Sequence, residues 1–235
     1  MDIKQAWSVF VSQMVEHNGY KRVLEGLGNT ALIAVIGLVI GIIIGTLLAV
    51  TKVVPQKKWY ARMFSKLTDI YVALFRGTPM VVQLLVMYYV LFPLIGLGNL
   101  SAVVVAVIAF GMNSGAYVCE IMRSGILSVD HGQMEAGRAL GLGYSRTMFS
   151  IVIPQAIKNI LPTLGNEFIS LIKETSVASF ITVIDLTAAF KNIGSGSYEY
   201  VIPYLVLALC YLVIVFIITI CIRLLERRLR ASEKR

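Results

Sequence analysis

ALIAVIGLVIGIIIGTLLAV, residues Ala31–Val50, is a run of twenty amino acids without a charge. A helix of that length spans about 30 Å, which is the thickness of the hydrocarbon core of a bilayer. Two further uncharged runs of at least that length follow, at Leu100–Cys119 and Tyr200–Ile222. Because 57% of the residues are hydrophobic and only 14% are charged, the composition excludes an ordinary soluble domain. The sequence therefore predicts an all-α protein that crosses a membrane several times.

Two less uniform apolar segments complete the predicted bundle. Residues 67–92 are interrupted at Arg76–Pro79, where a break is expected because proline disfavours helix in the residue before it. Residues 149–184 carry Pro154 and Pro162, which predict a broken helix. We therefore expect a single domain, 1–235, of five transmembrane helices, at about 26–51, 67–92, 100–122, 149–184 and 200–222.

The basic residues lie mainly on one side of these five helices. Fourteen of them fall in the first and third loops and the C-terminal tail, against four in the N-terminal segment and the other loops. Since cytoplasmic loops carry an excess of Lys and Arg, the N-terminus is predicted outside and the C-terminus in the cytoplasm. The same distribution accounts for the net charge of +8, so nucleic acid is not an expected partner.

A glycine stripe runs along the first predicted helix. Gly37, Gly41 and Gly45 recur every four residues, and small residues at this spacing let another helix backbone approach closely. The stripe is compatible with a seam between two copies of the chain. It is equally compatible with the general frequency of glycine in membrane helices, so both interpretations stay open.

The third predicted loop contains EAGRALGLGYSRTMFSIVIP, residues Glu135–Pro154. Asp130 and Gln133 approximate a capping box at the start of a short helix, and Gly141 with Gly143 provides its end. We therefore expect a cytoplasmic helix over about 131–141, between transmembrane helices 3 and 4. Its small residues would fit a groove of another protein, although residue types alone equally allow a surface helix without a partner.

This stretch resembles the EAA loop of ABC-transporter membrane subunits, in which E-A-A, three residues, glycine, nine residues and I-x-L-P follow one another. Gly137 replaces the third alanine here, and Ile153 replaces the leucine before Pro154. Four further blocks are similar to permeases for polar amino acids, of the histidine, glutamine, glutamate and arginine type. They are Phe75–Tyr89, Asn113–Gly137, Ile153–Ser176 and Leu224–Arg230, and the resemblance covers about residues 22–230.

The resemblance implies the membrane-spanning subunit of an ATP-dependent, binding-protein-dependent amino acid importer in the bacterial cytoplasmic (inner) membrane. It implies two cytoplasmic ABC ATPase subunits, a second permease copy or paralogue, an extracellular or periplasmic substrate-binding protein and an amino acid as partners. The chain has no G-x-x-x-x-G-K-[ST] motif, so it is not expected to be an enzyme. No cofactor, metal site or catalytic residue is predicted. The residues that the resemblance assigns to the ATPase contact are Gln133, Glu135, Ala136, Gly137, Arg138 and Gly141.

Ionisable residues inside apolar spans are costly, which makes them candidates for the transport path. Asn113, Tyr117 and Glu120 share one face of a helix, and a carboxylate at that position suits an ammonium or a cationic side chain. The guanidinium of Arg76 suits a substrate carboxylate, while an Arg76–Glu120 ion pair that only orients helices is an equally good interpretation. The complete set of candidates is Arg76, Thr78, Asn113, Tyr117, Glu120 and Glu167.

Three other functions are alternatives to an amino acid importer. A gradient-driven channel or secondary transporter would leave the EAA-like loop unexplained. A membrane-embedded enzyme is not supported, because the sequence shows no metal-ligand cluster. A permease for another small polar solute, such as cystine or an opine, fits the same blocks. The sequence leaves open which amino acid is carried and whether the permease pairs with itself or with a related chain.

Overall fold

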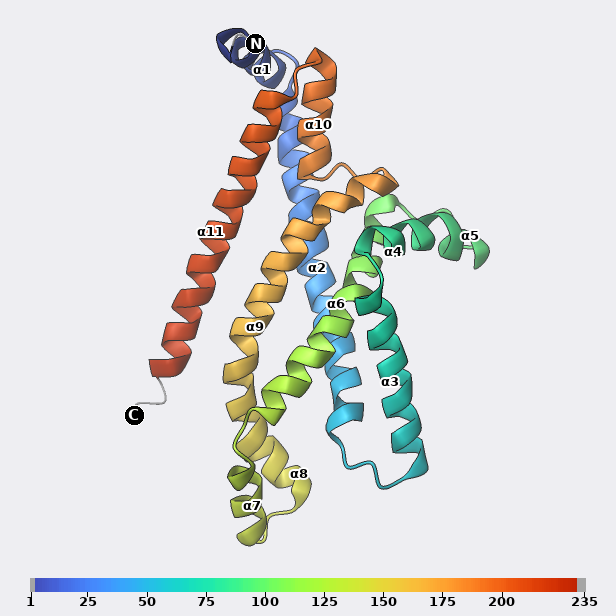
Figure 1. Cartoon of the computed structure of the whole chain (residues 1–235), viewed down its shortest axis with the longest axis vertical. Coiled ribbons are helices and arrows are strands. Elements are labelled where there is room, and N and C mark those ends of the chain that lie inside the picture. Colours follow the sequence, from blue (N-terminus) through green and yellow to red (C-terminus); the bar gives the residue numbers. More distant parts are fainter. Residues whose placement is uncertain (1–2, 232–235) are drawn as a thin grey trace.

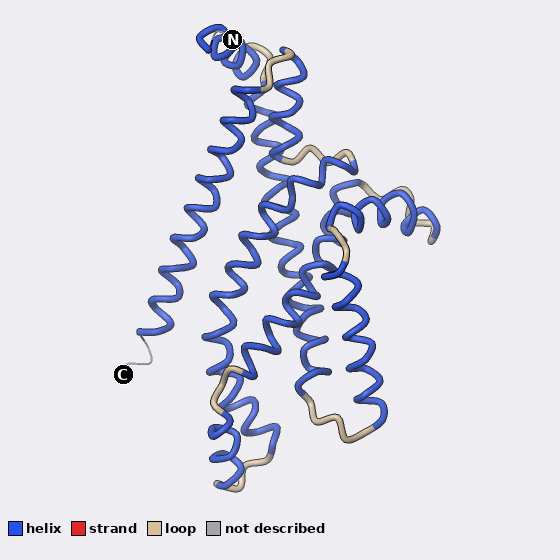
Figure 2. Tube along the Cα trace, viewed as in Figure 1, coloured by secondary structure: helices blue, strands red, loops and turns tan. Residues whose placement is uncertain are grey.

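The computed structural model describes residues 3–231, which form helices and loops only (Figures 1 and 2). In chain order the elements are α1 (Ile3–Val15), α2 (Gly19–Val53), α3 (Trp59–Gly77), α4 (Met80–Val86), η1 (Met87–Leu91), α5 (Phe92–Leu94), α6 (Ala102–Leu127), α7 (His131–Ala139), α8 (Tyr144–Thr147), η2 (Met148–Val152), α9 (Ile153–Glu174), η3 (Thr175–Ile181), α10 (Leu186–Ser197) and α11 (Val201–Ala231).

Three helices are long and apolar enough to cross a membrane: α2, α6 and residues Val201–Arg228 of α11. The bent pair formed by α3 and Met80–Leu94 would be a fourth span. Charged and amide side chains such as Asn166 and Glu167 make α9 more polar, although α9 runs beside α11 (Figure 1). The membrane character and the all-helical fold agree with the expectation, while five spans and their orientation stay predictions.

The interruption expected at Arg76–Pro79 is a sharp bend. α3 ends at Gly77 and α4 begins at Met80, and the two directions differ by 105°. Thr78 has φ −122° and ψ 144°, the extended conformation that a following proline imposes. Residues 80–94 therefore do not continue the path of α3, so one straight span over 67–92 is not what the chain forms.

Two other prolines are accommodated by wider helical turns. The π-helical segments η1 and η2 each end two residues before a proline, Pro93 and Pro154 respectively. A proline ring collides with the carbonyl four residues earlier in an α-helix, and a π turn moves the hydrogen bonds to the fifth residue. Pro162 lies inside α9 without ending it. The expectation that prolines break residues 149–184 is therefore wrong for this segment.

The glycine stripe of α2 packs against α6 of the same chain. A Cβ on Gly41 would lie 2.7 Å from the Cβ of Ser114, and one on Gly45 would lie 2.6 Å from the Cβ of Val118. On the other side of the contact, Gly111 makes room for Ile40. Close approach of small residues is thus used inside one molecule, so the stripe is not available as a seam between two copies.

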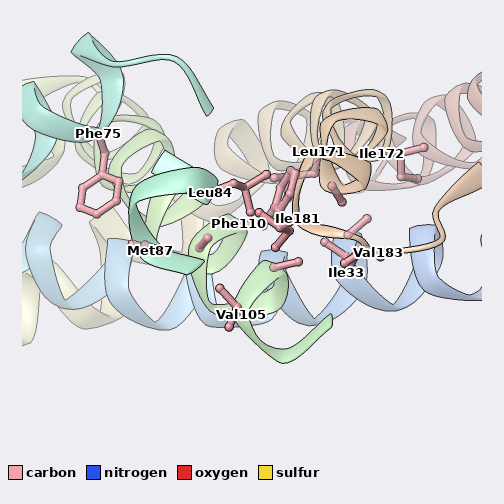
Figure 3. Packing of buried hydrophobic residues seen from close by; sticks show 14 of the residues in the cluster. Ile33, Phe75, Leu84, Met87, Val105, Phe110, Leu171, Ile172, Ile181 and Val183 are labelled. Carbon is pink, nitrogen blue, oxygen red and sulfur yellow. The ribbon is translucent and has the colours of Figure 1, made fainter. Parts of the chain in front are cut away.

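The core gathers where α2, α4, α6, α9 and η3 meet. Ile33, Leu84, Phe110, Leu171 and Ile181 are fully or almost fully buried there and point toward one another (Figure 3). Leu84 comes from the segment beyond the 105° bend, so the core holds α4 against α6 and η3.

Two helices at the end of the molecule opposite α7 were not predicted, namely α1 and α10 (Figure 1). The connection expected between residues 184 and 200 instead contains α10. Asp185 is buried and caps α10, because its carboxylate accepts hydrogen bonds from the backbone N–H groups of Thr187 and Ala188, at 2.9 and 3.0 Å. Short, weakly periodic segments of this kind give little sequence signal.

Candidate functional site

The short helix α7 lies at one end of the molecule, beside α8 (Figure 1). Its bounds, His131–Ala139, fall within the expected interval of 131–141. Five of the six residues assigned to a partner contact are exposed, namely Gln133, Glu135, Ala136, Arg138 and Gly141. No ion pair within 4.0 Å joins Glu135 to Arg138 in the described part of the chain, and Nη1 of Arg138 donates to the carbonyl of Leu142 at 3.4 Å.

A side chain of the same chain caps the N-terminus of α7. The Oδ1 atom of Asp130 accepts a hydrogen bond of 2.8 Å from the backbone N–H of Gly132, which confirms the predicted N-cap. The prediction of a reciprocal bond from the Gln133 side chain back to the N-cap is wrong. The side chain of Gln133 does not turn back, since its Oε1 accepts a bond of 3.2 Å from Nε2 of Gln155.

The C-terminus of α7 is also capped by groups of the same chain. Gly141 has φ +82°, a left-handed conformation that glycine adopts without steric cost. The backbone N–H of Leu142 bonds the carbonyl of Gly137 at 3.1 Å, and that of Gly141 bonds the carbonyl of Arg138 at 3.0 Å. These two bonds form a Schellman motif. Gly143 has φ −66° and precedes α8, so Gly141 alone ends α7.

Gly137 is buried, in contrast to its exposed neighbours. A Cβ at this position would lie 2.5 Å from Cγ2 of Thr147, and the Thr147 hydroxyl donates to the carbonyl of Gly143 at 3.2 Å. The small size of Gly137 therefore serves packing between α7 and α8 rather than an external contact. Thr147 is a residue that the sequence did not single out, because its partner in space is ten positions away.

Tyr144 links this end of the chain to α2. Its hydroxyl donates to the backbone carbonyl of Val53 at 3.4 Å, and burial raises the pKa of the Tyr144 phenol above its ordinary value. The phenol therefore keeps the proton that it donates. Tyr144 therefore connects α8 to the end of α2, and α8 continues through η2 into α9.

A second polar cluster lies at the bend between α3 and α4, with Gln83 at its centre. The Nε2 atom of Gln83 donates to the carbonyl of Phe75 at 2.8 Å and to the carbonyl and hydroxyl of Thr78 at 3.0 and 2.8 Å. The buried Asn113 of α6 donates to Oε1 of Gln83 at 2.9 Å. The structure thus brings the candidates Thr78 and Asn113 together in a network that holds the bend. Gln83 was missed, although it is the one polar side chain of Met80–Met87.

Charged side chains lie next to this network. Nη1 of Arg76 is 3.8 Å from Oε2 of Glu120, and its guanidinium carbon is 5.3 Å from the centre of the Tyr117 ring. Arg123 approaches the same Oε2 at 3.3 Å. The side chains of Arg76, Glu120 and Arg123 are 44%, 34% and 37% exposed. Because these charges are not buried, a zwitterionic solute can compete for the carboxylate and for the guanidinium.

Glu167 belongs to a different contact. It lies on α9 and accepts a hydrogen bond of 3.0 Å from the hydroxyl of Ser114 on α6. The six candidates for a path are therefore divided among the bend network, the Arg76–Glu120–Arg123 cluster and this α6–α9 pair. Among residues 3–231, no group of three or more His, Cys, Asp or Glu side chains is arranged to hold a metal ion.

The chain is similar to known membrane subunits of transport systems. A family model described as "Binding-protein-dependent transport system inner membrane component" matches residues 37–231. A putative glutamine transport system permease protein of Rickettsia bellii is 40% identical over 210 residues, covering 89% of this chain and 94% of that protein. An arginine transport system permease protein of Bacillus subtilis is 38% identical over 211 residues, with 90% and 94% covered. A crystal structure of an amino acid ABC transporter with histidines aligns with a TM-score of 0.82 at 39% identity, covering 93% of this chain and 98% of that one.

Proposed function

Because the chain belongs to the family of binding-protein-dependent transport system inner membrane components, we propose that it forms the translocation path of an ATP-driven amino acid importer. Two relatives carry the names of glutamine and arginine permeases, and a similar solved structure is an amino acid ABC transporter. The substrate is therefore an amino acid in this proposal. ATP hydrolysis takes place in a separate subunit.

The proposed topology has five spans, with α9 as the fourth and the α7 end in the cytoplasm. Lys57, Lys58 and Arg62 lie in and after the connection between α2 and α3, at the same end of the molecule as α7 (Figure 1). Their charge supports a cytoplasmic position. The bacterial inner membrane is the location that fits this arrangement, with the substrate-binding protein on the opposite side.

Docking of the ATPase on α7 rests on one observation. α7 is capped at both ends by its own chain, yet it leaves Glu135, Ala136 and Arg138 exposed at the basic end of the molecule. Such a helix needs no partner for its backbone and offers its side chains to one. Movement of a docked ATPase would pass through Tyr144 to α2 and through η2 to α9.

The solute path is proposed to pass the Arg76–Glu120 pair. An amino acid carries a carboxylate and an ammonium, and these are the complements of the guanidinium and carboxylate that lie 3.8 Å apart across α3 and α6. Tyr117 packs under the Arg76 guanidinium and limits its orientation. The bend network of Gln83 and Asn113 supports the backbone from which Arg76 projects.

The test is uptake of labelled amino acid into proteoliposomes that hold the permease, its ATPase and its binding protein. Glu135→Lys should abolish ATP-dependent uptake while the permease stays inserted. Glu25→Lys, the same charge change on an exposed residue at the other end of the molecule, should leave uptake unchanged. Normal uptake by Glu135→Lys would exclude docking at α7, and uptake without any ATPase subunit would favour a gradient-driven transporter.

A further inference from the structure

The N-terminal helix α1 has three distinct faces. Ala6 and Phe10 are buried and pack in a cluster with Phe190 and Ile193 of α10 and Ile202 of α11. The polar residues Gln5, Ser8 and Ser12 lie on a second face, and the hydroxyl of Ser12 donates to Glu16 just after the helix. The remaining face carries exposed apolar side chains together with Lys4, and within residues 3–231 none of its apolar side chains is buried.

This unpartnered face is a regular stripe. Ile3, Trp7, Val11 and Val15 recur at every fourth residue and are all exposed, by 67%, 53%, 40% and 67%. With about 3.6 residues per turn, such positions follow one another along one side of the helix. The stripe borders the buried face of Ala6 and Phe10 on one side and the polar face on the other. That arrangement of one apolar and one polar face beside each other is the pattern of a helix that lies in a membrane interface.

Aromatic side chains collect at the same level of the molecule. Tyr20 is the second residue of α2, Tyr198 and Tyr200 lie between α10 and α11, and Tyr204 lies in the first turn of α11, all of them exposed. α1 contacts both α2 and α11 at this end and lies at a steep angle to α11 (Figure 1). Trp and Tyr are enriched at membrane–water interfaces, so a group of tyrosines at this end is the pattern expected where a bilayer ends.

The surface next to α1 is apolar as well. A hollow of about 290 Å³ lies between the first half of α2 and α11, and its walls include Val23, Leu27, Val206 and Val213. Exposed leucines such as Leu205 and Leu209 continue this surface along α11. This apolar surface of α2 and α11 therefore begins near the end of the molecule at which α1 contacts both helices.

We propose that α1 is an interfacial anchor whose face of Ile3, Trp7, Val11 and Val15 is immersed in the boundary between lipid headgroups and acyl chains. The occupant of this face is the bilayer itself. The anchor fixes the ends of α2, α10 and α11 at the membrane surface through Ala6 and Phe10. Its assignment to the outer leaflet rests on the proposed function and topology, whereas its immersion in lipid does not.

The chain offers a direct probe, since it contains two tryptophans, Trp7 and Trp59. The Trp59→Phe variant leaves Trp7 as the single tryptophan, and Trp7→Phe provides the matched control with Trp59 alone. The full-length chain is placed in bilayers that contain phospholipids brominated either near the headgroup or near the bilayer centre, and in separate samples it is titrated with aqueous iodide. Trp7 should be quenched about twofold more by shallow than by central bromine, and iodide should reach it poorly.

Two further variants test which face of α1 is immersed, because each introduces a negative charge on a different face. In the Trp59→Phe background, Val11→Glu on the apolar stripe should lower quenching of Trp7 by shallow bromine, whereas Gln5→Glu on the polar face should not. Free access of iodide to Trp7, without quenching by brominated lipid, would overturn the proposal. So would protection from iodide that develops only when the substrate-binding protein is added, because that face would then bind protein. Uptake is measured on the same variants, so absent uptake with normal Trp7 quenching would count against the proposed function alone.

Discussion

Gly137 and Thr147 are in such close contact that a Cβ on the glycine would lie 2.5 Å from Cγ2 and 2.9 Å from Oγ1 of the threonine. Thr147 is completely buried, so it has little room to move. The third position of the EAA-like motif is therefore determined by packing within the chain. Only glycine fits at position 137 while α7 and α8 keep this arrangement.

The first prediction is that Gly137→Ala destabilises the permease. Alanine favours helix over glycine by about 1 kcal/mol, but overpacking a rigid contact costs about 1–3 kcal/mol. We expect a net loss of stability, measured as a lower midpoint of thermal unfolding in nanodiscs, together with weaker ATP-dependent uptake.

Thr147→Ser provides the matching control, because it removes Cγ2 and keeps the hydroxyl that bonds Gly143. Combined with Gly137→Ala it should restore part of the lost stability, because it removes the closer of the two contacts, giving a coupling energy of about 1 kcal/mol in a double-mutant cycle. Independent, additive effects of the two substitutions would contradict the contact.

The second prediction concerns the bend between α3 and α4. Gln83→Leu keeps the approximate volume but removes the donor to the carbonyls of Phe75 and Thr78 and the acceptor for Asn113. Each buried polar group that loses its partner costs about 1–3 kcal/mol. The unfolding midpoint should fall clearly, while Gln56→Leu in the exposed loop before α3 should leave it unchanged. Equal midpoints for the two variants would show that the network does not hold the bend.

Much of the fold follows from local signals in the sequence. The apolar runs predict α2, α6 and α11, Pro79 predicts the break after α3, and Asp130 and Gly141 predict the ends of α7. These signals act over a few residues, because capping, the proline restriction and apolar length are local properties. The π turns before Pro93 and Pro154 were not predicted, since a proline can either end a helix or widen it and the surrounding packing decides.

The candidate site was predictable in part for the same reason. Glu120 and Arg123 are three residues apart, so their pairing follows from helix geometry, and Arg76 was singled out as a charge in an apolar span. Gln83 and Thr147 act through residues that only the tertiary fold brings near. The burial of Gly137 likewise depends on how α8 folds back beside α7, which composition does not indicate.

The third prediction addresses the charged cluster. Glu120→Gln should reduce uptake about tenfold at matched expression, because it removes the proposed ligand for the substrate ammonium and leaves two guanidiniums unbalanced. Partly exposed ion pairs contribute at most about 1 kcal/mol to stability, so the unfolding midpoint should change little. Unchanged uptake with a large fall in the midpoint would mean that Glu120 only orients helices.

The last prediction uses two glycines of the same helix, Gly41 and Gly28. A Cβ on Gly41 would meet Ser114 at 2.7 Å, whereas a Cβ on Gly28 would have no atom within 4 Å. Gly41→Ala should therefore lower the free energy of unfolding by about 1–3 kcal/mol. Gly28→Ala should leave it unchanged or raise it by up to about 1 kcal/mol, through helix propensity alone. Thermal unfolding of the two variants in nanodiscs measures the difference. The opposite signs are the decisive feature, since a general effect of glycine on the flexibility of α2 would move both variants in one direction. A shared sign would contradict the conclusion that the stripe from Gly37 to Gly45 is the contact between α2 and α6.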